Sequence, residues 1–408
     1  MAKQKEMSDM KIHGTITILA LALSLFMSSC SAPAGKTDTP AADTAGTTAA
    51  AEEAAPQHTA DHGEMRDIDI HELVGEMKTG WNLGNTLDAK GGETAWGNPK
   101  TTHEMIDAIA EAGFNVIRLP TTWGDKMGDS STGYKVSEEW MDRVGEIVDY
   151  AFDNDMFVIL NCHHETSWIK PAMSETDNVL PKFTALWTQI AEHFEPYGDH
   201  LIFEGLNEPR IEGGANEWNG GTADGREALN VLNKAFVDTV RAAGGNNSRR
   251  ALLITTFAAQ VAKSALDDLV IPDDDRVMVS LHAYTPYNYT YNSKESWEVF
   301  TFTDDVAKEI DSVFDRIDKY FTDKNIPVVI TEYGSVSKSE PGELTRNDSE
   351  NAKWVKYYLG RAKKSGIPCV WWDNGYYYNG NELFGQFDRK NLTWFVPEVI
   401  DSIMSVYE

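Results

Sequence analysis

Eight short apolar segments recur along most of this chain, and each is followed by a stretch with the periodicity of an amphipathic helix. Most of the eight are continuous apolar runs rather than alternating ones, which is typical of strands buried on both faces. The predicted strands are TGWNLGN (79–85), FNVIRLP (114–120), FVILNCHH (157–164), HLIFEGLNE (200–208), RALLITT (250–256), VMVSLHAY (277–284), PVVITEYG (327–334) and PCVWWDNG (368–375). The predicted helices are 102–113, 137–155, 180–194, 226–245, 261–269, 305–321, 350–366 and 396–407.

Strict alternation of eight strands with helices predicts the α/β class and a (β/α)₈ barrel of the TIM type, which typically takes about 250 residues plus insertions. A doubly wound open sheet is the alternative. That fold usually has fewer strands and, when it binds a nucleotide, a glycine-rich first turn. Neither G-x-G-x-x-G nor G-x-x-x-x-G-K-[ST] occurs in the chain. The pattern therefore favours the barrel.

Residues 1–30 have the features of a secretory signal peptide: three lysines, an apolar run at 16–27, and small residues before Cys30. The apolar run is short for a membrane span. The sequence Met-Ser-Ser-Cys resembles a bacterial lipobox, so we expect a lipid on Cys30 that tethers the protein to a membrane without spanning it. An ordinary signal peptide with a chance cysteine is the alternative. Both predict an extracytoplasmic protein, either a bacterial cell-surface lipoprotein or a secreted one.

Residues 31–64 consist mostly of Ala, Thr, Pro, Gly and acidic residues, and this composition predicts a flexible linker. A single folded domain is then expected at 65–408. The chain has 64 acidic and 36 basic residues and a formal net charge of −28. Such a surface repels phosphate backbones, which excludes nucleic acid as an expected partner. We expect a monomer whose only contact with a membrane is the lipid on Cys30.

Polar or ionisable residues stand at the carboxyl ends of seven of the predicted strands. TIM barrels hold their active sites at this edge. Such side chains are costly at the end of an apolar strand unless they are used or paired. The residues concerned are Asn82, Asn85, Arg118, His163, His164, Asn207, Glu208, His282, Tyr284, Glu332, Tyr333 and Asp373.

Two of these side chains are carboxylates. Glu208 ends the fourth strand and Glu332 the seventh, so they are expected to face each other across the barrel mouth. Facing carboxylates suit glycoside hydrolysis, in which one protonates the leaving oxygen and the other acts on the opposite side of the sugar. A separation of about 5–5.5 Å implies retention of configuration and a wider one inversion. The sequence alone leaves this separation open.

The segment LIFEGLNEPR (201–210) resembles the signature of glycoside hydrolase family 5, the cellulase family, in which an Asn-Glu-Pro carries the acid/base. The similarity extends from about residue 70 to the end of the chain. NEPRIEGGANEW (207–218) and NELFGQFDR (381–389) are similar to its subfamily 4, which acts mainly on β-1,4-glucans. Further blocks in family order are WNLGNTLDA (81–89), VIRLPTTW (116–123), ILNCHHE (159–165), SLHAY (280–284), ITEYG (330–334) and VWWDNG (370–375).

The resemblance implies a retaining mechanism, with Glu208 as general acid/base and Glu332 as nucleophile. The nucleophile must stay ionised, and Arg118 and Tyr284 are the groups expected to keep it so, by charge and by hydrogen bonding. A plain structural salt bridge is the alternative role for Arg118. Asn207 resembles the family's contact to the sugar 2-hydroxyl, a contact that strengthens toward the transition state.

The remaining predicted site residues are expected to contact the sugar. His163 and His282 resemble further cleavage-site residues of the family, and Trp372 resembles its stacking platform. Aromatic faces pack against the C–H groups of sugars, so tryptophans in loops on the same face are further candidates. The predicted substrate-binding residues are Asn85, Trp123, His164, Trp218 and Trp372.

A zinc site built from His163, His164 and Glu165 is an alternative for this part of the chain. Adjacent histidines on a strand point to opposite faces, which argues against a shared metal. The mechanism needs neither a metal nor an organic cofactor, so none is expected.

The overall prediction is a retaining endo-β-1,4-glucanase that acts on cellulose, mixed-linkage β-glucan or the xyloglucan backbone. Two alternatives stay open. The first is the same chemistry on another backbone, as in a β-mannanase or a xylanase. The second is a surface glycan-binding protein that has the cleft without catalysis.

Overall fold

A computed structural model describes residues 62–291, 299–339, 345–378 and 382–408. The chain divides into two units, Met1–Gln57 and His58–Glu408. The first unit lies wholly outside the described residues. The predicted signal peptide, the lipidation site at Cys30 and nearly all of the predicted linker therefore lie outside them too.

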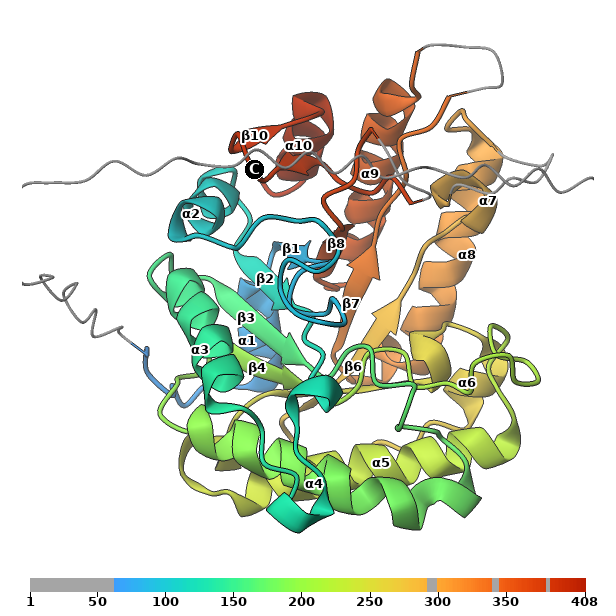
Figure 1. Cartoon of the computed structure of the whole chain (residues 1–408). Coiled ribbons are helices and arrows are strands. Elements are labelled where there is room, and N and C mark those ends of the chain that lie inside the picture. Colours follow the sequence, from blue (N-terminus) through green and yellow to red (C-terminus); the bar gives the residue numbers. More distant parts are fainter. Residues whose placement is uncertain (1–61, 292–298, 340–344, 379–381) are drawn as a thin grey trace, which may run out of the picture. The chain divides into compact units, whose positions relative to one another are not determined.

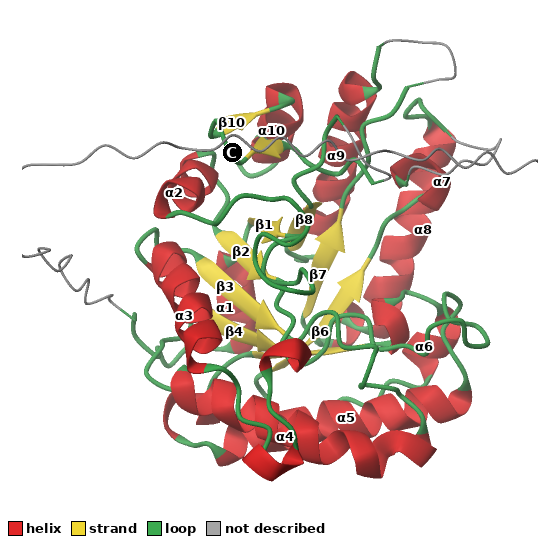
Figure 2. Cartoon of the chain, in the orientation of Figure 1, coloured by secondary structure: helices red, strands yellow, loops and turns green. Residues whose placement is uncertain are grey.

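Eight parallel strands close into a barrel in chain order, each one bonded to its sequence neighbours and the last one to the first. Figures 1 and 2 show the strands at the centre with helices around them. This confirms the predicted (β/α)₈ fold. The strands are β1 (Thr79–Leu83), β2 (Val116–Leu119), β3 (Phe157–Asn161), β4 (Leu201–Glu204), β5 (Leu252–Thr255), β6 (Val277–His282), β7 (Val328–Tyr333) and β8 (Cys369–Asp373).

All eight predicted helices are present. Ser137 accepts a hydrogen bond from the Trp140 N–H and begins α3, as the sequence predicts. The helices are α2 (His103–Glu111), α3 (Glu138–Phe152), α4 (Thr176–His193), α5 (Ala223–Ala242), α6 (Lys263–Asp267), α8 (Asp304–Tyr320), α9 (Asp348–Lys364) and α10 (Pro397–Met404). Short 3₁₀ turns lie at Gly124–Lys126, Ser130–Thr132, Met173–Glu175, Gly245–Ser248, Phe257–Ala259 and Thr322–Lys324.

Three features had not been predicted: helix α1 (Ile70–Glu76), the single turn α7 (Tyr287–Thr290), and a small hairpin of β9 (Phe387–Asp388) and β10 (Thr393–Trp394). Helix α1 carries apolar side chains at Ile70, Leu73 and Val74, a spacing that places them on one helical face. They cluster with strand residues near the amino ends of β2 to β8, including Val116 and Phe157. Helix α1 thus closes the amino-terminal end of the barrel, opposite the predicted site.

The main apolar core lies between the strands and the surrounding helices. Trp140, Trp187 and Trp354 are buried there on α3, α4 and α9. The packed structure begins slightly before residue 65. The carbonyls of His62 and Glu64 accept hydrogen bonds from Gly198 and Asp199. Within the described ranges, no helix combines the length and apolar character that a membrane span requires.

Candidate active site

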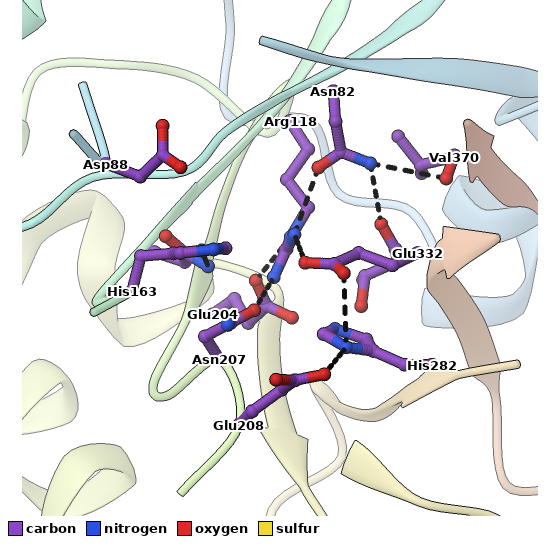
Figure 3. Close-up of polar contacts among 12 residues, drawn as sticks. Asn82, Asp88, Arg118, His163, Glu204, Asn207, Glu208, His282, Glu332 and Val370 are labelled. Carbon is purple, nitrogen blue, oxygen red and sulfur yellow. Dashed lines mark hydrogen bonds and ion pairs between the residues drawn. The ribbon is translucent and has the colours of Figure 1, made fainter. Parts of the chain in front are cut away.

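Arg118 is the hub of the carboxyl-terminal edge of the barrel (Figure 3). It projects from β2 and is fully buried. Its Nε donates to Glu204 at 2.7 Å and its Nη1 to Glu332 at 2.7 Å. Further hydrogen bonds reach Asn82 Oδ1 at 3.0 Å and Asn207 Oδ1 at 2.7 Å. One guanidinium therefore fixes side chains from β1, β7 and both the end and the following loop of β4.

Glu332 lies near the end of β7 and is held on both carboxylate oxygens. Oε1 accepts from Arg118, and Oε2 accepts from the Tyr284 hydroxyl at 2.9 Å. A register shift after Leu281 places His282 directly opposite Glu332 in the β6–β7 ladder. Burial raises the pKa of Glu332, and the charges of His282 and Arg118 offset only part of that rise. The contacts predicted for Arg118 and Tyr284 are thus present, but in the free protein they do not hold the pKa of Glu332 below its usual value.

Glu208 lies in the loop that follows β4, and its side chain is only partly buried. Its Oε1 lies 2.9 Å from Nδ1 of His282, and its Oε2 lies 3.4 Å from Arg210. Burial acts to raise the pKa of Glu208, but the hydrogen bond and charge of His282 outweigh burial, and the pKa is lowered. The same Nδ1 lies 3.4 Å from Oε2 of Glu332. The two carboxylates therefore share one imidazole and titrate as a pair.

The separation that the sequence left open is short. One ligand-type atom each of Glu208, His282 and Glu332 lies within 4.8 Å of the other two. Carboxylates this close match the retaining geometry of about 5–5.5 Å, since inverting pairs stand about 6.5–9.5 Å apart. The arrangement suits an attack by one carboxylate on a carbon whose leaving group the other protonates.

His163 lies just beyond β3 and is almost fully buried. Its ring is nearly parallel to that of Trp372, with centroids 5.8 Å apart. Nδ1 of His163 lies 3.1 Å from the side-chain amide nitrogen of Asn161. Burial lowers the pKa of His163 far below its usual value, so the ring is neutral at physiological pH.

The prediction that His163 and His164 point to opposite faces is wrong. β3 ends at Asn161, so neither histidine belongs to the strand and the alternation rule does not apply. Their ring centroids are 4.5 Å apart. Nε2 of His164 lies 3.5 Å from Oδ2 of Asp88, and one donor atom each of Asp88, His163 and His164 lies within 4.8 Å of the others.

Of the three tryptophans predicted to contact substrate, Trp218 and Trp372 have an exposed part and Trp123 has none. Trp372 at the end of β8 is 8% exposed, and a Cβ on Gly84 would lie 2.9 Å from a ring carbon, so the backbone at Gly84 passes close to this ring. Trp218 is 57% exposed, and the Arg210 guanidinium lies 4.5 Å from its ring centroid. Trp123 corrects a prediction. It is fully buried and donates from Nε1 to the Asn161 carbonyl at 2.8 Å, so it offers no face to a sugar.

Asn85 stands in the left-handed region with φ 55°. Its N–H donates to Asp88 Oδ2 at 3.1 Å, and its carbonyl accepts from Asn98 at 3.0 Å. It is partly exposed at the same edge of the barrel as the carboxylates. This placement is compatible with the predicted contact to substrate.

Sequence reasoning missed buried polar residues that hold the predicted site residues or the surrounding loops in place by hydrogen bonds. Glu204 is fully buried in β4, accepts from Arg118, and accepts from the Ser280 hydroxyl at 2.5 Å. A carboxylate inside an apolar strand was the available signal, because a buried charge needs a partner. Asn161 and Asp88 were also missed. Asn161 accepts from the Thr121 N–H in the loop after β2, and Asp88 accepts from the Thr86 N–H in its own loop.

Comparison with known proteins agrees with the arrangement of the two carboxylates. Residues 82–378 match the Cellulase family (glycosyl hydrolase family 5). Endoglucanase A of Ruminococcus albus is 53% identical over 348 residues, which are 84% of this chain and 94% of that protein. Endoglucanase B of Clostridium cellulovorans is 45% identical over 343 residues, which are 83% of this chain and 76% of that protein.

Solved structures agree. A GH5-4 broad-specificity endoglucanase from Clostridium acetobutylicum superposes with a TM-score of 0.79 at 43% identity and covers 83% of this chain and 99% of its own. A GH5-4 broad-specificity endoglucanase from Ruminococcus champanellensis with bound cellotriose gives a TM-score of 0.79 at 40% identity and covers 84% and 100%.

Proposed function

This chain belongs to glycosyl hydrolase family 5, the cellulase family, and on that premise we propose that it is a retaining endo-β-1,4-glucanase. The observation that carries the proposal is the placement of Glu208 and Glu332, with carboxylate oxygens that lie within 4.8 Å of each other at the carboxyl end of the barrel. The relatives that match nearly the whole domain include endoglucanase A of Ruminococcus albus and endoglucanase B of Clostridium cellulovorans.

In the free protein the pKa of Glu208 is lowered and that of Glu332 is raised, which favours the proton of this coupled pair on Glu332. The reactive complex is therefore the form with the proton on Glu208. In the first step Glu332 attacks the anomeric carbon, and Glu208 gives its proton to the departing glycosidic oxygen. The bond to the leaving chain breaks, and an ester bond to Glu332 forms. In the second step Glu208 takes a proton from water, the water oxygen attacks the same carbon, and Glu332 leaves as a carboxylate. Two inversions at one carbon give net retention.

The surrounding groups support these two steps. Arg118 and Tyr284 hold both oxygens of Glu332, so its attack direction is fixed before substrate arrives. Once Glu332 is esterified it carries no charge. Glu208 then loses a negative neighbour, so its pKa falls and its change from acid to base becomes easier. Arg118 also fixes the side-chain oxygen of Asn207 at 2.7 Å, which leaves the Asn207 amide nitrogen for the 2-hydroxyl of the sugar.

The proposed substrates are β-1,4-linked glucans: cellulose chains, mixed-linkage β-glucan and the xyloglucan backbone. Among the solved relatives, several are broad-specificity endoglucanases and one is a xyloglucan-specific endo-β-1,4-glucanase that binds cellotriose. A neutral polymer is compatible with a chain of net charge −28.

The test is parallel hydrolysis of xyloglucan, barley β-glucan, carboxymethylcellulose, mannan and xylan, with viscosity and reducing ends followed together. We expect a fast fall in viscosity on the glucans and little change on mannan and xylan. Preference for mannan or xylan would show that the proposed substrate is wrong, while the proposed hydrolytic mechanism would stand. Folded protein that releases no reducing ends from any of the five would instead indicate a glycan-binding protein.

For localisation we propose export and a lipid on Cys30, supported by the lysine-rich start, the apolar run at 16–27 and the Met-Ser-Ser-Cys sequence. Expression of the full-length protein in bacteria that are fed labelled palmitate tests this. Label in the protein should disappear in Cys30→Ser, and the variant should move from the membrane to the soluble extracytoplasmic fraction. Unlabelled, fully soluble wild-type protein would indicate an ordinary signal peptide. Monomeric state stays a prediction.

A further inference from the structure

Asn161, at the end of β3, makes three polar contacts with the loops after β2 and β3 and is fully buried. Its carbonyl accepts from Trp123 Nε1 at 2.8 Å. Its side-chain oxygen accepts from the backbone N–H of Thr121 at 3.0 Å. Its side-chain nitrogen lies 3.1 Å from Nδ1 of His163. The proposed mechanism assigns none of these contacts a role.

The contact with Thr121 fixes which way the Asn161 amide points. A backbone N–H can only donate, so the atom that faces it must be the amide oxygen. The amide NH₂ therefore faces His163. An amide NH₂ has no acceptor capacity, so Nδ1 of His163 must accept the hydrogen bond.

This contact sets the tautomer of the ring. His163 is neutral, because burial lowers its pKa far below the usual value. A neutral imidazole carries one proton, and if Nδ1 accepts, that proton is on Nε2. The backbone holds the ring in place as well, since the His163 N–H donates to the Thr121 carbonyl at 2.8 Å.

Protonated Nε2 has two consequences at the site. It presents a hydrogen-bond donor where His163 stacks beside Trp372, the predicted platform under the sugar. It also leaves Nε2 without a lone pair for a metal ion. His163 belongs to a group with metal-binding donor types, since one donor atom each of Asp88, His163 and His164 lies within 4.8 Å of the others. Zinc binds histidine through an unprotonated ring nitrogen.

We propose that Asn161 is a positioning residue that fixes His163 in the Nε2–H tautomer, so that the ring donates to a sugar hydroxyl and does not capture a divalent transition metal. The donation to a sugar rests on the proposed function. The tautomer and the resistance to metal do not.

Two measurements on the free full-length protein test the tautomer directly. Neutron diffraction should show deuterium on Nε2 of His163 and none on Nδ1. Alternatively, ¹⁵N-histidine NMR, assigned with His163→Gln, should show the protonated signal at Nε2. Deuterium on Nδ1 would overturn the proposal whatever the enzyme hydrolyses.

The decisive variant is Asn161→Asp, which has the same shape and still accepts from Thr121. Its second oxygen can only accept, so it should draw the proton to Nδ1 and leave a lone pair on Nε2. A carboxylate that accepts from one ring nitrogen while the other binds zinc is a common arrangement in zinc sites. We expect kcat/KM on β-glucan to fall about tenfold or more, because the donor to the sugar is lost.

Zinc separates this effect from general damage to the fold. Zinc should inhibit Asn161→Asp at a concentration at least about tenfold below that needed for wild type, the ratio expected for a difference of ~1.4 kcal/mol in binding. His164→Ala in the Asn161→Asp background should remove the added sensitivity. Equal zinc sensitivity of wild type and Asn161→Asp would contradict the proposal. If Asn161→Asp does not fold, the neutron and NMR measurements on wild type still decide it.

Discussion

Nη1 of Arg118 lies 2.7 Å from Oε1 of Glu332, and both side chains are buried, with exposed fractions of 0% and 6%. The same guanidinium lies 2.7 Å from Glu204, whose side chain is fully buried. Two buried carboxylates thus depend on one cation. Removing the partner of a buried charge is more costly than removing a surface pair, because the remaining charge is left without compensation.

Arg118→Lys should therefore impair the site more than its unchanged charge suggests. A lysine ammonium cannot reproduce the planar set of donors that reaches Glu204, Glu332, Asn82 and Asn207 together. We expect kcat to fall about 100-fold or more, in line with loss of preorganised electrostatic groups. Steady-state kinetics on a defined cello-oligosaccharide measure the fall in kcat, and thermal unfolding measures the loss of stability.

Arg250→Lys provides the matched control. Arg250 is also fully buried, but its guanidinium donates to backbone carbonyls such as those of Phe194 and Leu201, away from the carboxylates. Arg250→Lys should lower the unfolding free energy by about 3 kcal/mol, as for other losses of buried networks, and leave kcat of the folded protein near wild type. Equal effects of the two variants on kcat would contradict the assignment of Arg118.

The roles of the two carboxylates can be separated by azide. In Glu332→Gly the nucleophile is gone, so azide can attack the anomeric carbon directly while Glu208 protonates the leaving group. One inversion then gives an α-glycosyl azide. In Glu208→Ala, with an activated leaving group, Glu332 still forms the ester, and azide displaces it to give the β-glycosyl azide.

Both variants should lose activity on β-glucan without added azide. General acid/base catalysis typically contributes about 10²–10⁴-fold, so a fall of that size is expected for Glu208→Ala. NMR of the azide products gives the anomeric configuration. An α product from Glu208→Ala would mean that the two roles are exchanged, and the same variants with unchanged turnover would place the chemistry elsewhere.

The dependence of activity on pH should respond to His282. Its interactions lower the pKa of both Glu208 and Glu332. His282→Gln removes them, so both pKa values should rise. Catalysis needs one carboxyl protonated and the other ionised, which gives a bell-shaped profile of kcat/KM. Because both limbs belong to this pair, the whole bell should move to higher pH.

His103→Gln is the comparison for that shift. His103 lies on α2 at the surface, paired with Asp107 at 2.9 Å and Asp153 at 3.0 Å. The profile of His103→Gln should coincide with that of wild type. If the limbs of His282→Gln stay where they are in wild type, the shared imidazole does not set the ionisation of the pair.

Much of the fold could be predicted because buried segments need apolar residues, and these can be read from the sequence. Strands covered on both faces need continuous apolar runs, and all eight runs became strands. Helix α1 was missed because it is short and stands at the border of a low-complexity segment, although the spacing of Ile70, Leu73 and Val74 was readable. It packs against strand residues that point into the barrel, and the direction of these side chains is known only once the sheet is closed.

The site was predictable where its residues stand at strand ends, and the contacts of Arg118 and Tyr284 with Glu332 were predicted too. Glu208, Glu332 and Arg118 follow from the rule that barrel active sites lie at the carboxyl edge. The direction of a side chain beyond a strand does not follow from it. Trp123 turns into the core where an exposed face was expected, and His163 and His164 lie together where opposite faces were expected. Strand β3 ends at Asn161, before the end of its predicted run, whereas Trp123 lies in the loop after β2, where no strand pattern defines the direction of a side chain.

Trp218 and Trp123 should consequently respond to substitution in opposite ways. Trp218 is 57% exposed, so Trp218→Ala should leave thermal unfolding unchanged and raise KM for β-glucan about two- to tenfold, the range for loss of an aromatic stacking contact. Its ring also covers the guanidinium of Arg210, which lies 3.4 Å from Glu208, so a small change in kcat is expected as well.

Trp123→Ala should instead destabilise the fold by about 3–5 kcal/mol, as for other large-to-small changes in a core. It leaves a cavity and takes the Nε1 donor from the Asn161 carbonyl, which then stays buried without that partner. Differential scanning calorimetry and KM on barley β-glucan measure both variants. A large stability loss in Trp218→Ala, or a KM effect without stability loss in Trp123→Ala, would reverse the assignment of these two rings. The exposed tryptophan that contacts the sugar would then be the one after β2 rather than the one after β4, because only a ring that a sugar can reach changes KM without changing the stability of the barrel.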